Sequence, residues 1–576
     1  MKKIIILVLF LFIVTIIFNN YKYPNDIKKL QTITLYDSNN IEYYSVTKGY
    51  ERTYISNIPE HIKKAFVLIE DKNFYSHHGF DILRIARVLF TNFFSKKEGA
   101  STITQQLARM LFLNNEKTYQ RKFKELIIAL RLENKYSKDE ILECYLNNLY
   151  FGHNIYGIYD ASYFFFNKSI YEINNNELAM LIAIIKGPSI YSPINNYLKA
   201  NERKKIILKK IAKNEPSYDI SIYGKKTNKY NSSILFYKDI VLKYIDKNKS
   251  LDIYTNYDSN LGNEALKYEN SLICAVEPFS GKVKLVYSGN YYKSNYNKVM
   301  SSNRQIGSTI KPFLYYSALN CGMNPLSKFK SEKTSFKIKD TIYSPKNFND
   351  KYENDYITMA YALATSDNIY AVKTHLYIGT DKLVNTLSLL GIKSDKNPSL
   401  ALGCVDTTLY KLCNAYNILA SLGNEYRLYF INEIKENGKT IYTHKIQKNK
   451  KLNYEETFVI NHLLTYTFNK NISHKINVTG SSISPLLNYT YAGKSGSTDK
   501  DSYMIGFNKN ITIGVSTTYN DTINAKLIWA NIIESYNKSE AWYYDDNIKK
   551  IYANPTGFNN YMCNIYINEY LPKYKS

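Results

Sequence analysis

The sequence predicts a multidomain protein with an N-terminal transmembrane helix, an all-α domain and a second domain of the α+β class. Its 576 residues are too many for one hydrophobic core, because single cores stop growing beyond about 250–300 residues. Residues 4–18 are apolar apart from one threonine. Helical spacing of apolar residues dominates residues 51–212, whereas strand-like and helical runs alternate over residues 263–540.

The apolar run at the N-terminus is predicted to anchor the chain in a membrane. As a helix, its 15 residues span about 22 Å, and flanking residues with snorkelling lysines can cover the rest of a ~30 Å hydrocarbon core. No small-residue cleavage site follows, which favours a signal anchor over residues 1–22 rather than a removed signal peptide. Lys2 and Lys3 favour the cytoplasmic side, so we expect the remaining chain outside the cytoplasm, on the cytoplasmic (inner) membrane.

The formal net charge of the chain is +25, from lysines and arginines dispersed along its length. Such a charge can indicate nucleic-acid binding, but the sequence has no zinc-finger spacing, RNA-recognition signature or dense basic block. Dispersed cations also benefit a protein that works against an anionic membrane and phosphate-bearing substrates. We therefore expect the membrane as a partner and no nucleic acid.

The cysteines and histidines predict neither a disulfide framework nor a structural metal site, because no CxxC or HExxH motif occurs. Cys404 and Cys413 could pair if the geometry allows, but buried free thiols are the favoured interpretation. The six cysteines are Cys144, Cys274, Cys321, Cys404, Cys413 and Cys563.

Local signals divide the chain further. In the all-α region, capping boxes mark two helix starts, Ser137 with Glu140 and Asn174 with Glu177. In the α+β region, strand-like runs stand at both ends with helical runs between them, so we expect the two ends to pair in one sheet. The predicted divisions are an anchor over 1–22, a strand-bearing connector over 23–50, the all-α domain over 51–212, a linker over 213–262, the α+β domain over 263–540 and a tail over 541–576.

Polar and charged side chains interrupt the apolar pattern of the all-α domain in three places. Glu70 and Asp71 end an apolar run, residues 99–106 are rich in hydroxyls and amides, and Arg121 precedes Glu125 by one helical turn. Glycosyl transfer from a phosphate-bearing donor needs a carboxylate to accept a proton and cations to neutralise the departing pyrophosphate. Taken singly, Arg121 and Glu125 more often form a surface salt bridge, and a Glu-Asp pair more often ends a solvated helix.

In their order these segments resemble the glycosyltransferase domain of class A penicillin-binding proteins, the lysozyme-like family 51. The family patterns EDxxFxxHxG, GxSTITQQ, RKxxE and ILxxYLNxxYFG stand at residues 70–79, 99–106, 121–125 and 141–152. The resemblance implies a lysozyme-like fold, with lipid II and nascent peptidoglycan as partners. Met110 departs from the family, which often has asparagine there, and we expect this change to alter packing rather than chemistry.

The resemblance also implies residue roles. Glu70 would be the base that deprotonates the sugar 4-hydroxyl of incoming lipid II, and Glu125 would organise the donor's pyrophosphate, with or without a divalent cation (Mg or Mn). Arg109, Arg121 and Lys122 would bind phosphate. The other substrate-binding residues implied are Asp71, Phe74, His77, Ser101, Thr102, Thr104, Gln105 and Gln106.

Residues 80–94 form an amphipathic segment in which Arg84 and Arg87 stand among leucines, isoleucines and phenylalanines. Two interpretations stay open for it. It can be a core helix, or a lobe that dips into the bilayer, where a lipid-linked substrate resides.

The α+β region carries a second group of catalytic side chains. Ser308 and Lys311 stand three residues apart at a predicted helix start, so their side chains share one face. A lysine acts as a base only when its pKa is lowered, and a second cation such as Lys494 can lower it. Ser366 and Asn368 can relay a proton and hold a substrate amide. Taken singly, SxxK and KSG motifs occur by chance in many long proteins.

The ordered trio S-x-x-K, S-D-N and K-S-G resembles the set found in penicillin-binding proteins and class A β-lactamases, and its flanking segments resemble the class A transpeptidase domain. This resemblance implies an α/β/α-layered domain with an antiparallel sheet. It makes Ser308 the acylated nucleophile, Lys311 its general base, Ser366 the proton shuttle and Lys494 the residue that adjusts the electrostatics. The implied peptide-binding residues are Asn368, Gly496, Ser497 and Thr498.

This sequence departs from the family pattern in the strands around the K-S-G motif. Ser495 replaces the usual threonine, which is a conservative change. Tyr503 and Ser516 stand where tryptophan is commoner, so the pattern does not define the amine acceptor.

Together the two groups predict a bifunctional peptidoglycan synthase. It would polymerise lipid II and cross-link stem peptides by D-Ala-D-Ala transpeptidation through an acyl-serine intermediate, with β-lactams as inhibitors and other wall-synthesis proteins as further partners. No cofactor is expected for transpeptidation. Three alternatives stay open: a β-lactamase, a lysozyme-like hydrolase and a scaffold with inactive domains. The membrane anchor and the preceding glycosyltransferase motifs disfavour the first, and the intact catalytic residues disfavour the last.

Overall fold

The computed structural model describes residues 27, 32–47, 50–81, 101–113, 118–225, 230–246, 249–338, 341–518, 524–558 and 560–568. The predicted anchor and most of the amphipathic segment over residues 80–94 lie outside these ranges. Within them, no helix has both the length and the apolar character needed to cross a membrane. The chain forms two compact units, one from Met1–Thr34, Ser45–Lys229 and Asp246–Leu251, the other from Leu35–Tyr44, Tyr230–Ile245 and Asp252–Ser576.

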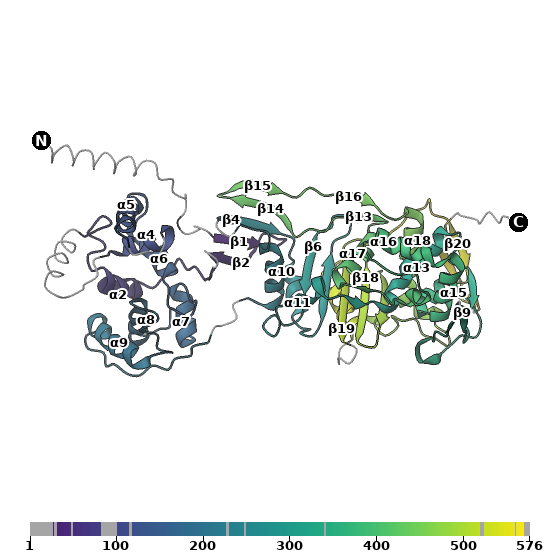
Figure 1. Ribbon diagram of the computed structural model, residues 1–576, viewed down its shortest axis with the longest axis horizontal. Helices are drawn as coiled ribbons and strands as arrows, with labels where there is room; N and C mark the ends of the chain where they lie inside the picture. Colours follow the sequence, from purple (N-terminus) through teal and green to yellow (C-terminus); the bar gives the residue numbers. More distant parts are fainter. Residues whose placement is uncertain are drawn as a thin grey trace. The chain divides into compact units, whose positions relative to one another are not determined.

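The first unit is built from helices, as predicted. The described helices are α2 (Glu60–Glu70), α4 (Ile103–Phe112), α5 (Tyr119–Lys135), α6 (Lys138–Asn148), α7 (Ile158–Phe166), α8 (Asn175–Ile185) and α9 (Tyr197–Ile211). Helix α8 lies in the middle of this unit and packs against α2, α7 and α9 (Figure 1). Its residues 178–184 are all buried, because a helix that is apolar on every side is stable only where other elements surround it.

The helix starts follow the local sequence. Both predicted capping boxes are present, at Ser137 for α6 and at Asn174 for α8. A third box begins α4: Thr102 Oγ1 accepts from Gln105 N at 3.2 Å, and Thr102 N donates to Gln105 Oε1 at 3.3 Å. The T-x-x-Q spacing carries this signal in the sequence, although we had not predicted it.

The second unit contains a five-stranded antiparallel sheet in the order β17-β18-β19-β5-β6. Its strands are β5 (Leu272–Val276), β6 (Val283–Tyr287), β17 (Ala492–Ser497), β18 (Asp501–Phe507) and β19 (Thr512–Thr518). Because β19 pairs with β5, with Thr512 opposite Val276, the two ends of the domain meet in one sheet. This confirms the predicted pairing.

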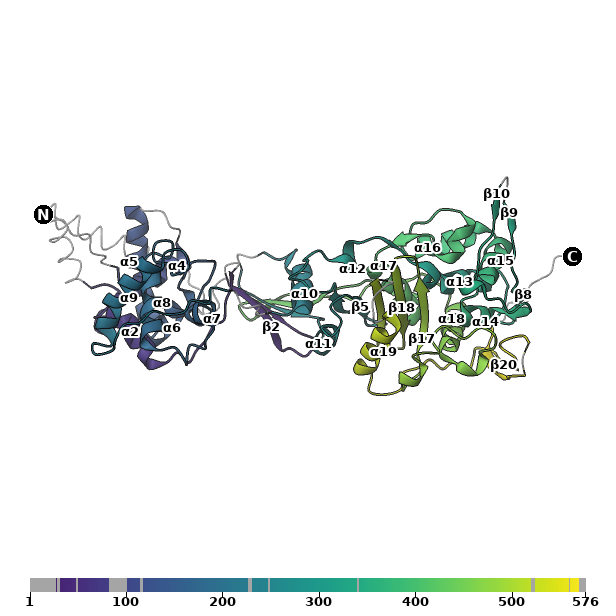
Figure 2. The same ribbon diagram turned by 90° about the horizontal axis from the view of Figure 1, so that it is seen from below.

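Helices cover both faces of this sheet (Figure 2). A Cβ placed on Gly514 would lie 3.2 Å from Leu409 of α17 (Leu409–Ala420), and one on Gly506 would lie 2.4 Å from Trp529 of α19 (Ala525–Tyr536). Gly506 is paired with Ile513, the neighbour of Gly514, so the two glycines face opposite sides of the sheet. The second unit therefore has the α/β/α layers that the family resemblance implies.

The remaining helices and strands complete the structure. The other helices are α10 (Ser232–Leu242), α11 (Ser259–Ala265), α12 (Lys298–Ser301), α13 (Lys311–Asn320), α14 (Met359–Thr365), α15 (Asn368–Ile378), α16 (Thr380–Leu389) and α18 (Tyr454–Thr465). The strand pairs are β7 (Arg304–Gln305) with β12 (Asp406–Thr407), β8 (Lys328–Lys330) with β11 (Tyr356–Thr358), β9 (Phe336–Ile338) with β10 (Thr341–Tyr343), and β13 (Asn424–Tyr426) with β16 (Lys448–Lys450). A second sheet has the order β15-β14-β4-β1-β2-β3, from β1 (Thr32–Tyr36), β2 (Glu42–Thr47), β3 (Tyr50–Glu51), β4 (Leu251–Thr255), β14 (Ile431–Glu436) and β15 (Lys439–Thr443).

The segment predicted as a C-terminal tail, residues 541–576, is packed into the second unit where it is described. Strands β20 (Lys550–Ala553) and β21 (Cys563–Tyr566) pair, and Trp542 and Tyr543 are buried. Aromatic rings bury a large area, and the Tyr543 hydroxyl donates to Ala420 O at 2.6 Å. The prediction of a tail was therefore wrong, because a tyrosine-rich composition conceals which rings pack inside.

The six cysteines are all free, so Cys404 and Cys413 do not pair. Cys144, Cys274 and Cys413 are buried, as expected. Cys321 and Cys404 are exposed, which the sequence did not predict.

Candidate active sites

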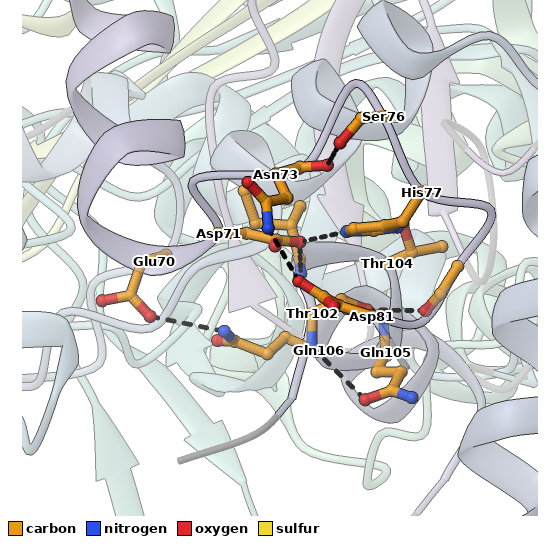
Figure 3. Close-up of polar contacts among 12 residues, drawn as sticks. Glu70, Asp71, Asn73, Ser76, His77, Asp81, Thr102, Thr104, Gln105 and Gln106 are labelled. Carbon is orange, nitrogen blue, oxygen red and sulfur yellow. Dashed lines mark hydrogen bonds and ion pairs between the residues drawn. The ribbon is translucent and has the colours of Figure 1, made fainter. Parts of the chain in front are cut away.

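The first site lies where α2 ends and α4 begins. Glu70 is the last residue of α2, and Asp71 follows it in an extended conformation. The two neighbouring carboxylates consequently lie in different surroundings: Glu70 is partly exposed, whereas Asp71 is buried. Figure 3 shows Glu70 turned towards Gln106, and Asp71 turned towards His77 and the start of α4.

The buried residues at this junction hold the backbone in place. Asp71 Oδ2 lies 3.0 Å from His77 Nε2 and accepts from Ile103 N at 2.9 Å, and Thr102 Oγ1 donates to Gly79 O at 2.7 Å (Figure 3). Other side chains predicted to bind substrate are also buried, and these are Phe74, Thr104 and Gln105. Thr104 Oγ1 donates to Glu133 Oε1 at 2.5 Å. We therefore assign the contacts of this group to the protein scaffold that positions Glu70.

Glu70 is connected to α4 and α6 through one amide. Gln106 Nε2 donates to Glu70 Oε2 at 3.3 Å, and the Tyr145 hydroxyl donates to Gln106 Oε1 at 3.2 Å. The amide therefore cannot rotate without losing one partner, which fixes the Glu70 carboxylate in orientation. Tyr145 lies in the motif at residues 141–152, which is the sequence signal for this contact, although Tyr145 is not among the predicted site residues.

Glu125 is the centre of a cluster of cations. It is 0% exposed, its Oε1 pairs with Arg121 Nη1, and its Oε2 lies 2.7 Å from Lys122 Nζ. Arg109 Nη1 of α4 lies 3.9 Å from Oε1, and Lys122 Nζ also donates to Ser101 Oγ at 2.7 Å. The interpretation of Glu125 as half of a surface salt bridge was therefore wrong. A buried carboxylate with several cations suits an anionic group bound beside it.

Helix α4 links the two carboxylates. Gln106 and Arg109 are one turn apart on it, the first contacting Glu70 and the second approaching Glu125. The structure thus brings Glu70, Gln106, Arg109, Arg121, Lys122 and Glu125 into one connected set. Gly99, which begins the GxSTITQQ motif, lies outside the described residues.

The residues around Glu125 do not fit a divalent cation. Arg121 and Lys122 already contact its two carboxylate oxygens, and a metal ion would be placed among positive charges. Mg²⁺ prefers several oxygen ligands, and the described part of the chain has no cluster of three acidic, histidine or cysteine side chains that could hold a metal.

The second site is built around the start of α13. Ser308 lies in the short 3₁₀ helix η2 (Gly307–Ile310), and Lys311 N donates to Ser308 O at its end. Side chains three residues apart are eclipsed in a 3₁₀ helix, so Ser308 and Lys311 project from the same face, as predicted. Ser308 is partly exposed, whereas Lys311 is completely buried.

The Lys311 ammonium is held by the loop Ser366-Asp367-Asn368 between α14 and α15. Its Nζ lies 2.6 Å from Ser366 O, 3.2 Å from Ser366 Oγ, 3.2 Å from Asp367 O and 2.8 Å from Asn368 Oδ1, so its three N–H donors are shared among four acceptors. Burial lowers the pKa of Lys311 to about 7, against a smaller opposing effect of the Asp367 charge. A lysine in this state is half neutral near neutral pH and can accept a proton.

Ser366 connects the two lysines. Lys494 Nζ of β17 donates to Ser366 Oγ at 3.0 Å and to Ser495 O at 2.8 Å. Burial, with the Lys311 charge as a further cause, lowers the pKa of Lys494 well below its usual value. Ser366 has a left-handed backbone, with φ of 63°, which is strained for serine and directs its hydroxyl between both amines.

Glycines allow the K-S-G strand to reach the nucleophile. A Cβ on Gly496 would lie 2.7 Å from Thr309 Cγ2 and 3.0 Å from Ile306 O, and one on Gly307 would lie 2.6 Å from Ser497 O. The family resemblance implies that Gly496 binds peptide. The structure shows that its missing side chain also lets β17 pack against η2, which sets the position of Ser308.

The end of β17 is fixed by a turn. Thr498 Oγ1 accepts from Asp501 N at 3.0 Å, and Arg304 Nη1 lies 2.7 Å from Asp501 Oδ1. Ser497 is exposed and Thr498 is partly exposed, so both can contact a ligand beside Ser308. Arg304 and Asp501 are not among the predicted site residues, although both flank the predicted motifs.

These two sites define a class of protein: a glycosyltransferase and a serine acyltransferase on one chain. Comparison with known proteins agrees. Residues 39–212 match the Transglycosylase family, and residues 272–555 match the family described as Penicillin binding protein transpeptidase domain.

Two relatives come from Bacillus subtilis. Penicillin-binding protein 2D is 36% identical over 95% of this chain and 87% of its own length, and penicillin-binding protein 1F is 33% identical over 90% and 79%. The crystal structure of penicillin-binding protein 1A from Haemophilus influenzae has the same fold, with a TM-score of 0.61 at 16% identity over 93% of this chain and 98% of that one. The chain belongs to the class A, bifunctional penicillin-binding proteins. It is a peptidoglycan glycosyltransferase and a serine-type D,D-transpeptidase.

Proposed function

We propose that the first unit polymerises lipid II with Glu70 as the base. The carboxylate accepts the proton of the acceptor's 4-hydroxyl as that oxygen attacks the donor sugar's anomeric carbon. The bond from this carbon to the pyrophosphate then breaks, and Arg109, Arg121 and Lys122 stabilise the leaving charge. The connection Glu70–Gln106, with Arg109 one turn further along α4, supports this division of roles.

In the second unit, neutral Lys311 removes the proton of Ser308 as its oxygen attacks the carbonyl of the D-Ala-D-Ala bond. Ser366 passes a proton to the leaving amine, with Lys494 beside it, and D-alanine departs from the acyl-serine. The backbone N–H groups of Ser308 and Ser497 would stabilise the oxyanion. The amine of a second stem peptide then attacks the ester and restores Ser308. The observation that carries this proposal is the contact of both Lys311 and Lys494 with Ser366.

β-Lactams fit the same proposal as inhibitors, because they acylate the serine and leave no small amine to depart. We place the chain in the cytoplasmic membrane with both units outside the cytoplasm. The apolar run over residues 4–18, after Lys2 and Lys3, supports this placement, as does a lipid-linked substrate. Other wall-synthesis proteins are proposed as partners.

One assay tests both sites: incubation of the full-length protein with lipid II in detergent, followed by analysis of glycan length and cross-links. We expect Glu70→Gln to abolish the polymer while fluorescent penicillin still labels the protein. Ser308→Ala should retain linear polymer but lose cross-links and label. Glu202→Gln, at an exposed position on α9, and Ser317→Ala, on α13, serve as matched controls.

The alternatives give different outcomes in the same experiment. Glycan that becomes shorter would indicate a hydrolase, and fast release of the penicillin label would indicate a β-lactamase. Polymer formation by Glu70→Gln at the wild-type rate would contradict the role of Glu70. Labelling of Ser308→Ala would contradict the role of Ser308.

A further inference from the structure

Every described hydrogen bond of the Lys311 amine goes to the loop Ser366-Asp367-Asn368. The position of the catalytic amine therefore depends on what holds this loop. Ser366 and Asp367 lie between the two helices, Asn368 is the first residue of α15, and Ser366 has a left-handed backbone. Asp367 caps α15 with its own side chain, and side chains outside the loop supply further contacts that hold it.

Asn347 is such a side chain. Its Oδ1 accepts from Asn368 N at 2.7 Å and from Ile369 N at 3.4 Å, and its Nδ2 donates to Asp367 Oδ2 at 2.7 Å. It is 7% exposed. Both ends of one amide thus bind the loop, one end at its backbone and the other at its buried carboxylate.

The neighbouring contacts strengthen this attachment. Asn368 Nδ2 donates to Lys346 O at 2.7 Å, which leaves Asn368 Oδ1 directed at Lys311 Nζ. Asp367 Oδ1 accepts from Tyr370 N at 2.7 Å, and Asp367 Oδ2 accepts from Ser331 Oγ as well as from Asn347. Asn347 is therefore the side chain that joins the carboxylate of Asp367 to the backbone of Asn368.

We propose that Asn347 is a positioning residue of the acyl-transfer site: it fixes the Ser366-Asp367-Asn368 loop and thereby the Lys311 amine beside Ser308. The inference rests on the proposed roles of Ser308 and Lys311. Misplacement of a catalytic group by about 1 Å can cost a factor of roughly 100 in rate. Loss of the Asn347 amide should therefore slow the acylation step while leaving ligand binding largely intact.

The chain offers a matched control in Asn508. Its Oδ1 accepts from Asn510 N at 2.9 Å and Ile511 N at 3.2 Å, its Nδ2 donates to Asn537 Oδ1 at 2.9 Å, and it is 0% exposed. The hydrogen-bonding pattern is the same as that of Asn347, but the contacts are at the turn between β18 and β19. Asn508→Ala therefore measures the cost of losing such an amide away from Lys311.

The test is stopped-flow acylation of the full-length protein by a chromogenic β-lactam, which separates the dissociation constant from the acylation rate constant. We expect Asn347→Ala to lower the acylation rate constant by about 10- to 100-fold. Its dissociation constant should stay within about threefold of wild type, since a positioning residue acts on the chemical step. Asn508→Ala should acylate within about twofold of wild type despite a similar loss of thermal stability, because its contacts are remote.

A second variant keeps the test informative if Asn347→Ala does not fold. Asn347→Asp places a carboxylate against Asp367, and like charges at this distance oppose each other until one oxygen is protonated. The protonated acid can donate to Asp367 as the amide does. The acylation rate of Asn347→Asp relative to wild type should therefore rise as the pH falls from 8 to 5.5, whereas the ratio for Asn508→Asp should not.

Two outcomes would overturn the proposal: equal acylation rate constants for Asn347→Ala and wild type, or equal losses in the Asn347 and Asn508 variants. A pH-independent ratio for Asn347→Asp would overturn it as well. Failure of the proposed function gives a different result from failure of this inference. In that case wild type itself would not be acylated at Ser308, and the mass of the peptide that contains Ser308 would show no added β-lactam.

Discussion

The acid limb of the acylation rate offers the sharpest test of the transpeptidase site. Burial lowers the pKa of Lys311 from 10.5 to about 7. This difference corresponds to roughly 5 kcal/mol at about 1.4 kcal/mol per pKa unit. A lysine with its ordinary pKa would be neutral in roughly one molecule in 3,000 at pH 7, whereas buried Lys311 is neutral in about half.

The expected profile follows from the neutral fraction. With a pKa of about 7, that fraction is roughly 0.1 at pH 6, 0.5 at pH 7 and 0.9 at pH 8, so the rate rises about tenfold and then levels. An unshifted lysine would give about a hundredfold rise over the same range with no plateau. The measurement is the second-order rate constant for acylation of wild type by a fluorescent penicillin, from pH 5.5 to 9.5, corrected for hydrolysis of the free drug.

Two results would refute the reasoning. One is a rate that still increases tenfold per pH unit at pH 9, and the other is a rate that does not change between pH 5.5 and 8. Glycan synthesis by the same sample shows whether extreme pH has inactivated the protein, because the proposed base of that reaction is Glu70 and not a lysine.

The lowered pKa of Lys311 also makes the free energy of unfolding depend on pH in a definite direction. Between about pH 7 and 10.5 the unfolded chain binds the Lys311 proton that the folded chain has lost, so this residue's contribution to the free energy of unfolding rises with pH across that window. Denaturant unfolding of wild type and Lys311→Met at pH 7 and 9.5 measures it. Wild type should gain stability relative to the variant at the higher pH.

Two further predictions concern packing. Gly496→Ala would bring a Cβ within 3.0 Å of Ile306 O, so we expect it to lose about 1–3 kcal/mol of stability in thermal unfolding and to be labelled more slowly by penicillin. Gly187→Ala makes only ordinary contacts of 3.6 Å and should keep the stability and the labelling rate of wild type. Unchanged labelling by Gly496→Ala would contradict the role given to this glycine. Trp542→Ala removes a buried ring and should destabilise the second unit by about 3–5 kcal/mol in denaturant unfolding, while glycan synthesis continues. A loss below about 1 kcal/mol would contradict the assignment of Trp542 to the core.

The regular parts of the fold could be predicted because their signals are local. The capping boxes at Ser137 and Asn174 begin helices where predicted. Strands β5 and β19 lie near the two ends of the α+β domain, where strand-like runs are predicted, and these places were enough to predict their pairing. Hydrogen bonding within a turn or a strand depends on few neighbours, so a short window of sequence specifies it.

The remaining features depend on contacts between distant segments. Glu125 and Arg121 have the spacing of a surface pair, and only the packing of α4 against α5 shows that Glu125 is buried. Gly496 is explained by its approach to Ile306, which lies 190 positions earlier in the chain (496 − 306). Trp542 and Tyr543 are buried although their segment has the composition of a tail. No local pattern distinguishes these cases from their commoner interpretations.

The two sites use burial of charge in opposite ways. Glu125 is buried beside Arg121, Lys122 and Arg109, so it is surrounded by cations, and the surplus of positive charge is available for a phosphate. Lys311 is buried against neutral oxygens, and no described carboxylate lies within ion-pair distance of its amine, so burial disfavours its charged form.

The carboxylate of Asp367 is kept from pairing with Lys311 by its own hydrogen bonds. It accepts from Asn347, Ser331 and Tyr370 N, while its backbone oxygen faces the amine. If Asp367 were free to turn towards Lys311, an ion pair would form, the pKa of the lysine would rise and the base would be lost near neutral pH. The contacts that orient this carboxylate therefore help to keep Lys311 able to accept a proton near neutral pH.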